Sequence, residues 1–244
     1  GSIDAADDAT LDFTGVSGEL DLTVDTTNDY VVKGSSTAKS TIKMSGGLDS
    51  DDNIQGGSAT TDVVTASIDG LANSTTSTTG KLTISGIETI ELDTASNASS
   101  LDLSGVTGAS TIAVGSAQNV TIDKLAAGVA VQYGVTASSD YTGNLEVKLA
   151  DATGSDDSLT INLAKRGADD EVDGTLTTTG IETVTINDLS TNTNQILHSA
   201  TTNTSIVDFS STSVLTLFGD SGTSVSLTSA SPSQTAALAA SGTT

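Results

Sequence analysis

The sequence predicts an all-β protein, a parallel β-helix or β-solenoid built from repeat units of about 90 residues. Three observations predict it. Apolar residues fall in short alternating runs such as Leu20-Asp21-Leu22-Thr23-Val24, which suit half-buried strands. Segments recur along the chain in the same order, and Gly, Ser, Asn and Asp separate the runs. Tandem β-sandwich modules are the alternative, because strand spacing alone does not distinguish the two folds.

Three segment pairs carry the repetition. Residues 11–18 (LDFTGVSG) recur at 101–108 (LDLSGVTG), an offset of about 90. Residues 85–92 (SGIETIEL) recur at 179–186 (TGIETVTI), and residues 62–68 (DVVTASI) resemble 157–163 (DSLTINL). We therefore expect one unit at 1–100, a second at 101–190 and a partial third at 191–244. Each unit would bury small inward-facing side chains against its neighbours.

The composition excludes several functions. The 244 residues include 31 acidic and 8 basic ones, for a net charge of −23. This charge argues against binding nucleic acid or an anionic membrane. The chain has no Cys and one His, so neither a thiolate zinc site nor a multi-His site is expected. No apolar run approaches the ~20 residues of a membrane-spanning helix.

Acidic residues gather in Gly-rich turns, where their oxygens could bind calcium. The alternative is that these clusters are solvated turns that keep the protein soluble. Repulsion between the carboxylates favours a bound cation. The candidate metal ligands are Asp49, Asp51, Asp52, Asn53, Asp62, Asp151, Asp156, Asp157, Asp169, Asp170 and Asp173.

Two glutamates recur within the Gly-Ile-Glu-Thr segments, Glu88 and Glu182. Repetition at equivalent places predicts a structural role for them, such as capping a turn or bonding to neighbouring backbone. The apolar residues beside them, Ile87, Ile90, Ile181 and Val184, are predicted core positions.

The turn at 46–57 (GGLDSDDNIQGG) resembles a degenerate Gly-Gly-x-Gly-x-Asp nonapeptide of RTX proteins. Together with residues 62–64 and 86–90, it resembles a module of bacterial surface-layer and RTX-associated secreted proteins. Residues 150–188 resemble a second copy. The resemblance implies a secreted, calcium-stabilised solenoid at the cell surface that assembles with itself into a lattice.

We expect no enzyme activity. Arg166 is the sole Arg, six aromatic residues are scattered, and no nucleophile elbow or phosphate-binding loop is present. An adhesin stalk or a module that binds cell-surface polysaccharide is the alternative function, and a polysaccharide-active β-helix enzyme ranks below it.

Overall fold

The structure is a computed structural model. It describes residues 2–3, 8–24, 29–45, 48, 52–67, 83–93, 99–115, 119–134, 144–153, 157–163, 173–178, 181, 183–188, 195–200, 203–207, 214–219 and 225–228. In this part of the chain all regular structure is β-strand, and every strand pairing is parallel. No described helix is long and apolar enough to span a membrane.

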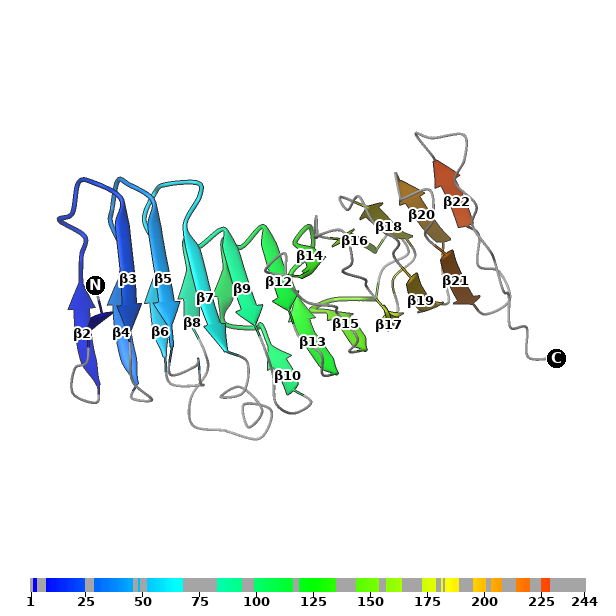
Figure 1. The fold of residues 1–244 in the computed structure, drawn as a ribbon, viewed down its shortest axis with the longest axis horizontal. Helices are drawn as coiled ribbons and strands as arrows, with labels where there is room; N and C mark the ends of the chain where they lie inside the picture. Colours follow the sequence, from blue (N-terminus) through cyan, green and yellow to red (C-terminus); the bar gives the residue numbers. More distant parts are fainter. Residues whose placement is uncertain are drawn as a thin grey trace.

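One sheet, sheet A, runs through the whole stack from the N-terminal to the C-terminal coils (Figure 1). It has 11 strands in the order of the chain. They are β1 (Ser2–Ile3), β3 (Leu20–Val24), β5 (Ser40–Met44), β7 (Val63–Ser67), β9 (Thr89–Asp93), β12 (Thr111–Gly115), β14 (Ala130–Tyr133), β16 (Ser158–Leu163), β18 (Thr183–Asp188), β20 (Asn203–Val207) and β22 (Val225–Thr228).

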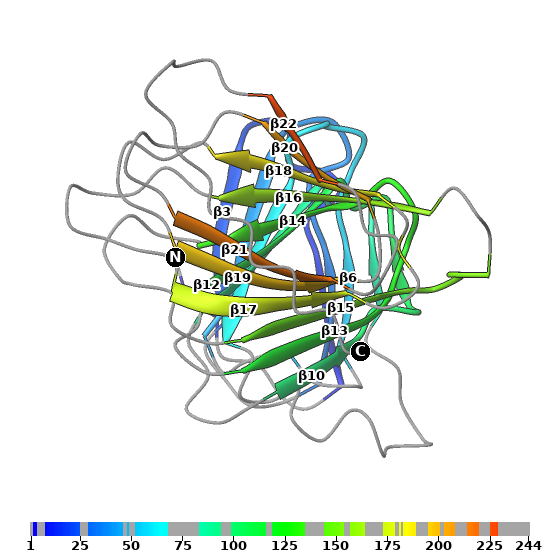
Figure 2. The same ribbon diagram turned by 90° about the vertical axis from the view of Figure 1, so that its right-hand side faces the viewer.

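Two shorter sheets complete the coils. Sheet B serves the N-terminal half with β2 (Ala9–Asp12), β4 (Tyr30–Lys33), β6 (Asn53–Gln55), β8 (Thr83–Ser85) and β11 (Val106–Thr107). Sheet C serves the C-terminal half with β10 (Ser99–Asp102), β13 (Val120–Leu125), β15 (Leu145–Leu149), β17 (Asp173–Thr178), β19 (Gln195–Ala200) and β21 (Val214–Gly219). Figure 2 shows sheet C as a layer separate from the strands of sheet A. The predicted parallel β-solenoid is therefore confirmed.

Each coil stacks its residues on those of the coil before it. Tyr30 lies beside Asp52 and Ser40 beside Asp62, in each case 22 residues apart, whereas Asp62 and Glu88 are 26 apart. The sequence recurrence near 90 residues therefore spans several coils. The division at residues 100 and 190 stays a prediction.

The core consists of columns of aliphatic side chains, one from each coil. Parallel pairing places the same inward position of successive strands side by side, and alternation keeps that position inward. In sheet A each described side chain of the inward column is at most 3% exposed. These side chains are Leu22, Ile42, Val64, Ile90, Ile112, Val131 and Ile161. β-branched side chains fit such a column because they pack closely on a pleated surface.

The predicted core positions beside the repeated glutamates are confirmed where they are described. Ile87, Ile90 and Ile181 are at most 1% exposed. The side chain of Val184 lies outside the described part of the structure, although its backbone belongs to β18.

Candidate functional site: carboxylates at the corners of the coils

A column of polar residues lies at the corner where the chain enters sheet A. Ser40, Asp62 and Glu88 occupy this position in successive coils. The Ser40 N–H donates to Asp62 Oδ1 (2.6 Å), and the Asp62 N–H donates to Glu88 Oε2 (2.8 Å). Each carboxylate thus accepts the backbone N–H of the residue stacked one coil earlier. This arrangement provides acceptors for the backbone N–H groups at the corner, which the hydrogen bonds between strands do not satisfy.

Asp62 is fully buried, and both of its carboxylate oxygens accept backbone hydrogen bonds. Its Oδ2 accepts the N–H of Gly57 (2.8 Å), which closes the turn between β6 and β7. One coil earlier the Ser40 hydroxyl accepts the Ser35 N–H (2.9 Å) in the same way. Charge-assisted bonds to backbone amides offset the cost of burying the Asp62 carboxylate.

The Gly-Ile-Glu-Thr segment gives a shorter version of this corner. Gly86 adopts a φ of +62°, a left-handed conformation that glycine reaches without strain. Ile87 is buried, and Glu88 reaches back to Asp62. The structural role predicted for Glu88 is therefore confirmed, whereas Glu182 lies outside the described residues.

Asp52 uses the same device at another corner, where the chain enters sheet B. Asp52, which is 3% exposed, precedes β6, and its Oδ1 accepts the Tyr30 N–H (3.1 Å). The Asp52 carbonyl in turn accepts the N–H of Thr83 in the next coil (3.1 Å). The corner therefore links three consecutive coils through one acidic residue.

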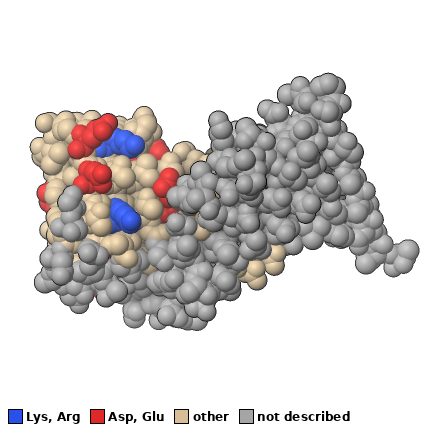
Figure 3. All heavy atoms as spheres, in the orientation of Figure 1, with Lys and Arg blue, Asp and Glu red and all other residues tan. Residues whose placement is uncertain are grey.

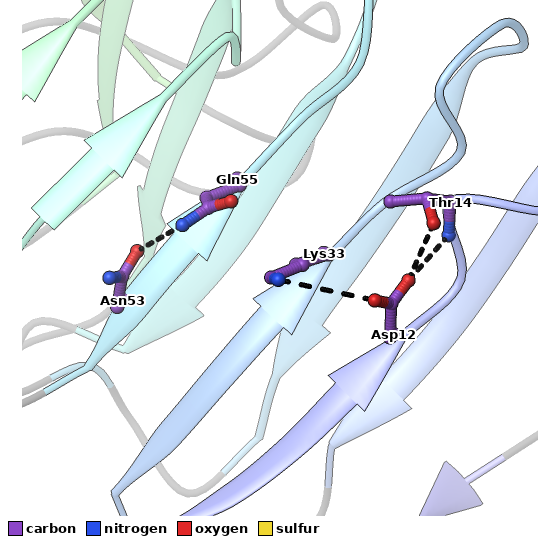
Figure 4. A network of polar contacts seen from close by, with 5 residues as sticks. All are labelled: Asp12, Thr14, Lys33, Asn53 and Gln55. Carbon is purple, nitrogen blue, oxygen red and sulfur yellow. Dashed lines mark hydrogen bonds and ion pairs between the residues drawn. The ribbon is translucent and has the colours of Figure 1, made fainter.

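A second group of carboxylates stabilises exposed turns at strand ends. In Asp12-Phe13-Thr14 the Oδ1 of Asp12 accepts both the Thr14 N–H (3.0 Å) and its hydroxyl (2.7 Å) (Figure 4). Asp151 and Thr153 repeat this geometry at 3.1 and 2.7 Å. These hydrogen bonds lower the pKa of Asp12 and of Asp151, and the bond from the threonine hydroxyl has a larger effect than the bond from its N–H.

Asp102 combines such a turn with an ion pair. Its Oδ1 accepts the Ser104 N–H (2.9 Å), and its Oδ2 lies 2.7 Å from Lys124 Nζ in the next coil. Partial burial alone would raise the pKa of Asp102, but the bonds from Lys124 and Ser104 outweigh it and lower the pKa to about 2. Lys33 pairs more loosely with Asp12, at 4.0 Å.

Figure 3 shows basic side chains lying directly beside acidic ones on the described face of the N-terminal coils. Threonine hydroxyls add to this pattern on the outer faces of the sheets. The Thr65 hydroxyl donates to Glu91 (3.1 Å), and the Thr121 hydroxyl donates to Glu146 (3.2 Å), each in the following coil. These two glutamates are therefore hydrogen-bonded to threonines of the preceding coil.

Serines provide a further contact between coils that the sequence reasoning missed. Ser58 donates both its N–H (3.4 Å) and its hydroxyl (2.9 Å) to the carbonyl of Ser36. Ser45 does the same to Val24, and Ser110 to Glu88. Each serine thus binds the coil before it twice through one carbonyl oxygen.

The corner column did leave a signal in the sequence. A Ser, Asp or Glu precedes a Thr or Val and then an Ile or Val at residues 40–42, 62–64, 88–90 and 110–112. This pattern marks the residue whose side chain or backbone joins successive coils at that corner.

The structure describes five of the eleven candidate metal ligands with their side chains. Asp52 and Asp62 bind backbone N–H groups as described above, and Asp151 caps its own turn. Asn53 Oδ1 accepts the Gln55 side-chain amide at 3.3 Å (Figure 4), and Asp157 directly precedes β16. Asp173 opens β17 with its side chain outside the description, and the remaining candidates lie outside the described residues: Asp49, Asp51, Asp156, Asp169 and Asp170.

Across the described residues, no three His, Cys, Asp or Glu side chains lie together in a group that could hold a metal ion. The carboxylates of Asp12, Asp52, Asp62, Asp102 and Asp151 accept hydrogen bonds from backbone N–H groups, and some also from a hydroxyl or a lysine. No protein-family model, curated protein or solved structure matches the chain. The resemblance to RTX-associated surface-layer proteins therefore rests on the sequence motifs.

Proposed function

We propose that the chain is a structural component of a bacterial surface layer, secreted to the cell surface, where it assembles with itself into a lattice stabilised by calcium. The proposal rests on the structural role of the buried acidic side chains. The buried carboxylates of Asp52 and Asp62 hold one coil to the next through backbone N–H groups. These two acidic side chains are buried and join neighbouring coils, which is the role expected of structural residues.

The calcium part of the proposal concerns the acid-rich turns that remain after these roles are assigned. Asp49 and Asp51 directly precede the structural Asp52 in the segment that resembles the RTX nonapeptide. A net charge of −23 opposes both folding and the approach of a second copy. Divalent cations at such turns would reduce both costs.

Microscopy and melting of the full chain test the proposal together. We expect two-dimensional sheets in millimolar calcium that come apart in chelator. A ligand at about a hundredfold excess over its Kd stabilises the folded state by about 2.7 kcal/mol, so the melting temperature should rise with calcium. Asp51→Asn should reduce this rise, whereas the matched Asp12→Asn change at a threonine-capped turn should leave it intact. An identical melting midpoint in calcium and chelator would remove calcium from the proposal.

An adhesin stalk is the second candidate, because the strands stack along the longest axis of the molecule (Figure 1). A stalk should remain a monomeric rod with or without calcium. Sheets in the microscope favour the lattice, and isolated rods under both conditions favour the stalk.

A further inference from the structure

The single histidine of the chain, His198, lies in strand β19 in the C-terminal half of the solenoid. In sheet C it is in register with Leu176 of β17 on one side and with Leu217 of β21 on the other. Figure 2 shows these three strands side by side. The structure describes the backbones of β19 and β21 but not their side chains, so strand register is what places this residue.

The position of His198 belongs to a buried column of sheet C. In the preceding coils the same column passes through Val120, Leu145 and Leu176, and each of these side chains is at most 1% exposed. Parallel pairing keeps one position on the same face of successive strands, and no register shift separates Leu145 from Leu217 along this column. His198 is therefore the one titratable residue among five column positions, and the other four are aliphatic.

The strands around this position carry few charges. β17 and β21 flank β19 in sheet C, and β18 and β20 precede and follow it along the chain. Within these four described strands the charged residues are Asp173, three positions before the residue that pairs with His198, and Asp188, the last residue of β18 in sheet A. Glu182 and Asp208 lie in connecting segments outside the described residues. Neither described aspartate shares the register of His198, so the column itself supplies no carboxylate to pair with an imidazolium ion.

We propose that His198 is a proton switch: the coils from β19 onward stay closed while it is neutral and open when it takes up a proton. A position in a buried column disfavours the charged form of a histidine, whereas the unfolded chain accepts the proton freely. Stability of these coils is therefore complete above about pH 6.5, where an unperturbed histidine is neutral, and falls as the pH drops below it. Opening of one coil releases those stacked on it, since each coil contacts only its neighbours. The switch belongs to the fold and does not depend on the proposed lattice.

NMR of the full chain measures the titration of His198 directly, because a chain with one histidine gives one imidazole signal. We expect the midpoint of this titration to lie below the value of about pH 6.5 of an unperturbed histidine. A solvent-facing histidine on a chain of net charge −23 would instead titrate above that value, since surrounding negative charge favours the protonated form. A midpoint at or above about pH 6.5 in the wild type would overturn the proposal.

The neighbouring residue Leu197 provides a matched control. It is in register with Thr175 and Thr216, so it occupies the alternate face of the strand. The double variant Leu197→His, His198→Leu keeps the composition of the chain and moves the imidazole by one position. Its histidine should titrate above about pH 6.5, as expected for the solvent face of an acidic protein. Equal midpoints in this variant and in the wild type would contradict the switch.

Amide hydrogen exchange measures the opening of the coils. We expect the protection of the β19 amides to fall up to about tenfold in the wild type between about pH 7.5 and 5.5, because an unfolded histidine gains a proton over this range. The β19 amides of His198→Leu should keep their protection, since leucine continues the column, and so should the Ile42 amide in the N-terminal coils of the wild type. An equal fall in the wild type and His198→Leu, or at β19 and Ile42, would refute the switch and leave the scaffold function standing.

Discussion

The role of Asp62 gives the sharpest test of the corner column. Asp62→Asn keeps the shape of the side chain but replaces one acceptor oxygen by an NH2 group. Because Oδ1 and Oδ2 each accept a backbone N–H, at 2.6 and 2.8 Å, the new NH2 group must face either Ser40 or Gly57. One backbone amide, fully buried at Ser40 or partly buried at Gly57, then loses its acceptor.

The size of the effect follows from these contacts. A hydrogen bond to a charged group contributes about 1.5–3 kcal/mol, and a buried donor left unsatisfied costs about 1–3 kcal/mol. Release of the buried charge offsets part of this loss. We expect Asp62→Asn to lower the free energy of unfolding by about 3 kcal/mol, which corresponds to a fall in melting temperature of about 6–12 °C for a chain of this length.

Calorimetry of the wild type, Asp62→Asn and Asp151→Asn measures this effect. Asp151→Asn removes the same charge at an exposed turn, so it should change the melting temperature by much less. The loss in Asp62→Asn should be equal in calcium and in chelator, because backbone N–H groups occupy both oxygens. A loss seen only in calcium, or a midpoint equal to that of Asp151→Asn, would refute the reasoning.

Three further predictions concern single contacts, each measured by denaturant unfolding. Gly56→Ala should destabilise the fold by about 3 kcal/mol, because an added Cβ would overlap the Gly86 carbonyl oxygen; Gly18→Ala, with open space around its Cβ, should be near neutral. Asp102→Asn should be less stable than the wild type at neutral pH. Since folding lowers the pKa of Asp102 from 3.8 to about 2, this difference should shrink as the pH falls through that range; a difference independent of pH would contradict it. Thr178→Val should raise stability by about 1 kcal/mol, because within the described residues the buried Thr178 hydroxyl has no hydrogen-bond partner; a loss of stability would show that it has one.

Much of the fold was predictable because the pattern of the strands is local. Alternation in segments such as Leu20–Val24 predicts an inward and an outward face, and the same alternation builds the buried columns of sheet A. The core positions Ile87 and Ile90 and the structural role of Glu88 followed from the repeated Gly-Ile-Glu-Thr segment alone.

The period of the coil was harder to predict because the corners differ in length. Ser40 and Asp62 are 22 residues apart, but Asp62 and Glu88 are 26 apart. A search for one fixed period therefore finds the longer recurrence and misses the coil. The change from sheet B to sheet C left no motif in the sequence, since it depends on the short connection at residues 126–129.

The hydrogen-bond partners of the acidic residues also could not be predicted from the residues next to them in the sequence. Asp62 stands in a Gly-rich stretch, which gives it the sequence context of a calcium ligand. Its hydrogen-bond partner Ser40 comes from the preceding coil, so only the stacking of coils reveals the contact. Asp52 and Tyr30 are related in the same way.

Amide hydrogen exchange tests most directly whether corner carboxylates hold successive coils together. The account predicts that the amides of Tyr30, Ser40 and Asp62, which donate to Asp52, Asp62 and Glu88, exchange as slowly as the ladder amides of Ile42 and Val64, in calcium and in chelator alike. Rapid exchange at these three corner amides beside slow exchange in the ladders would contradict it.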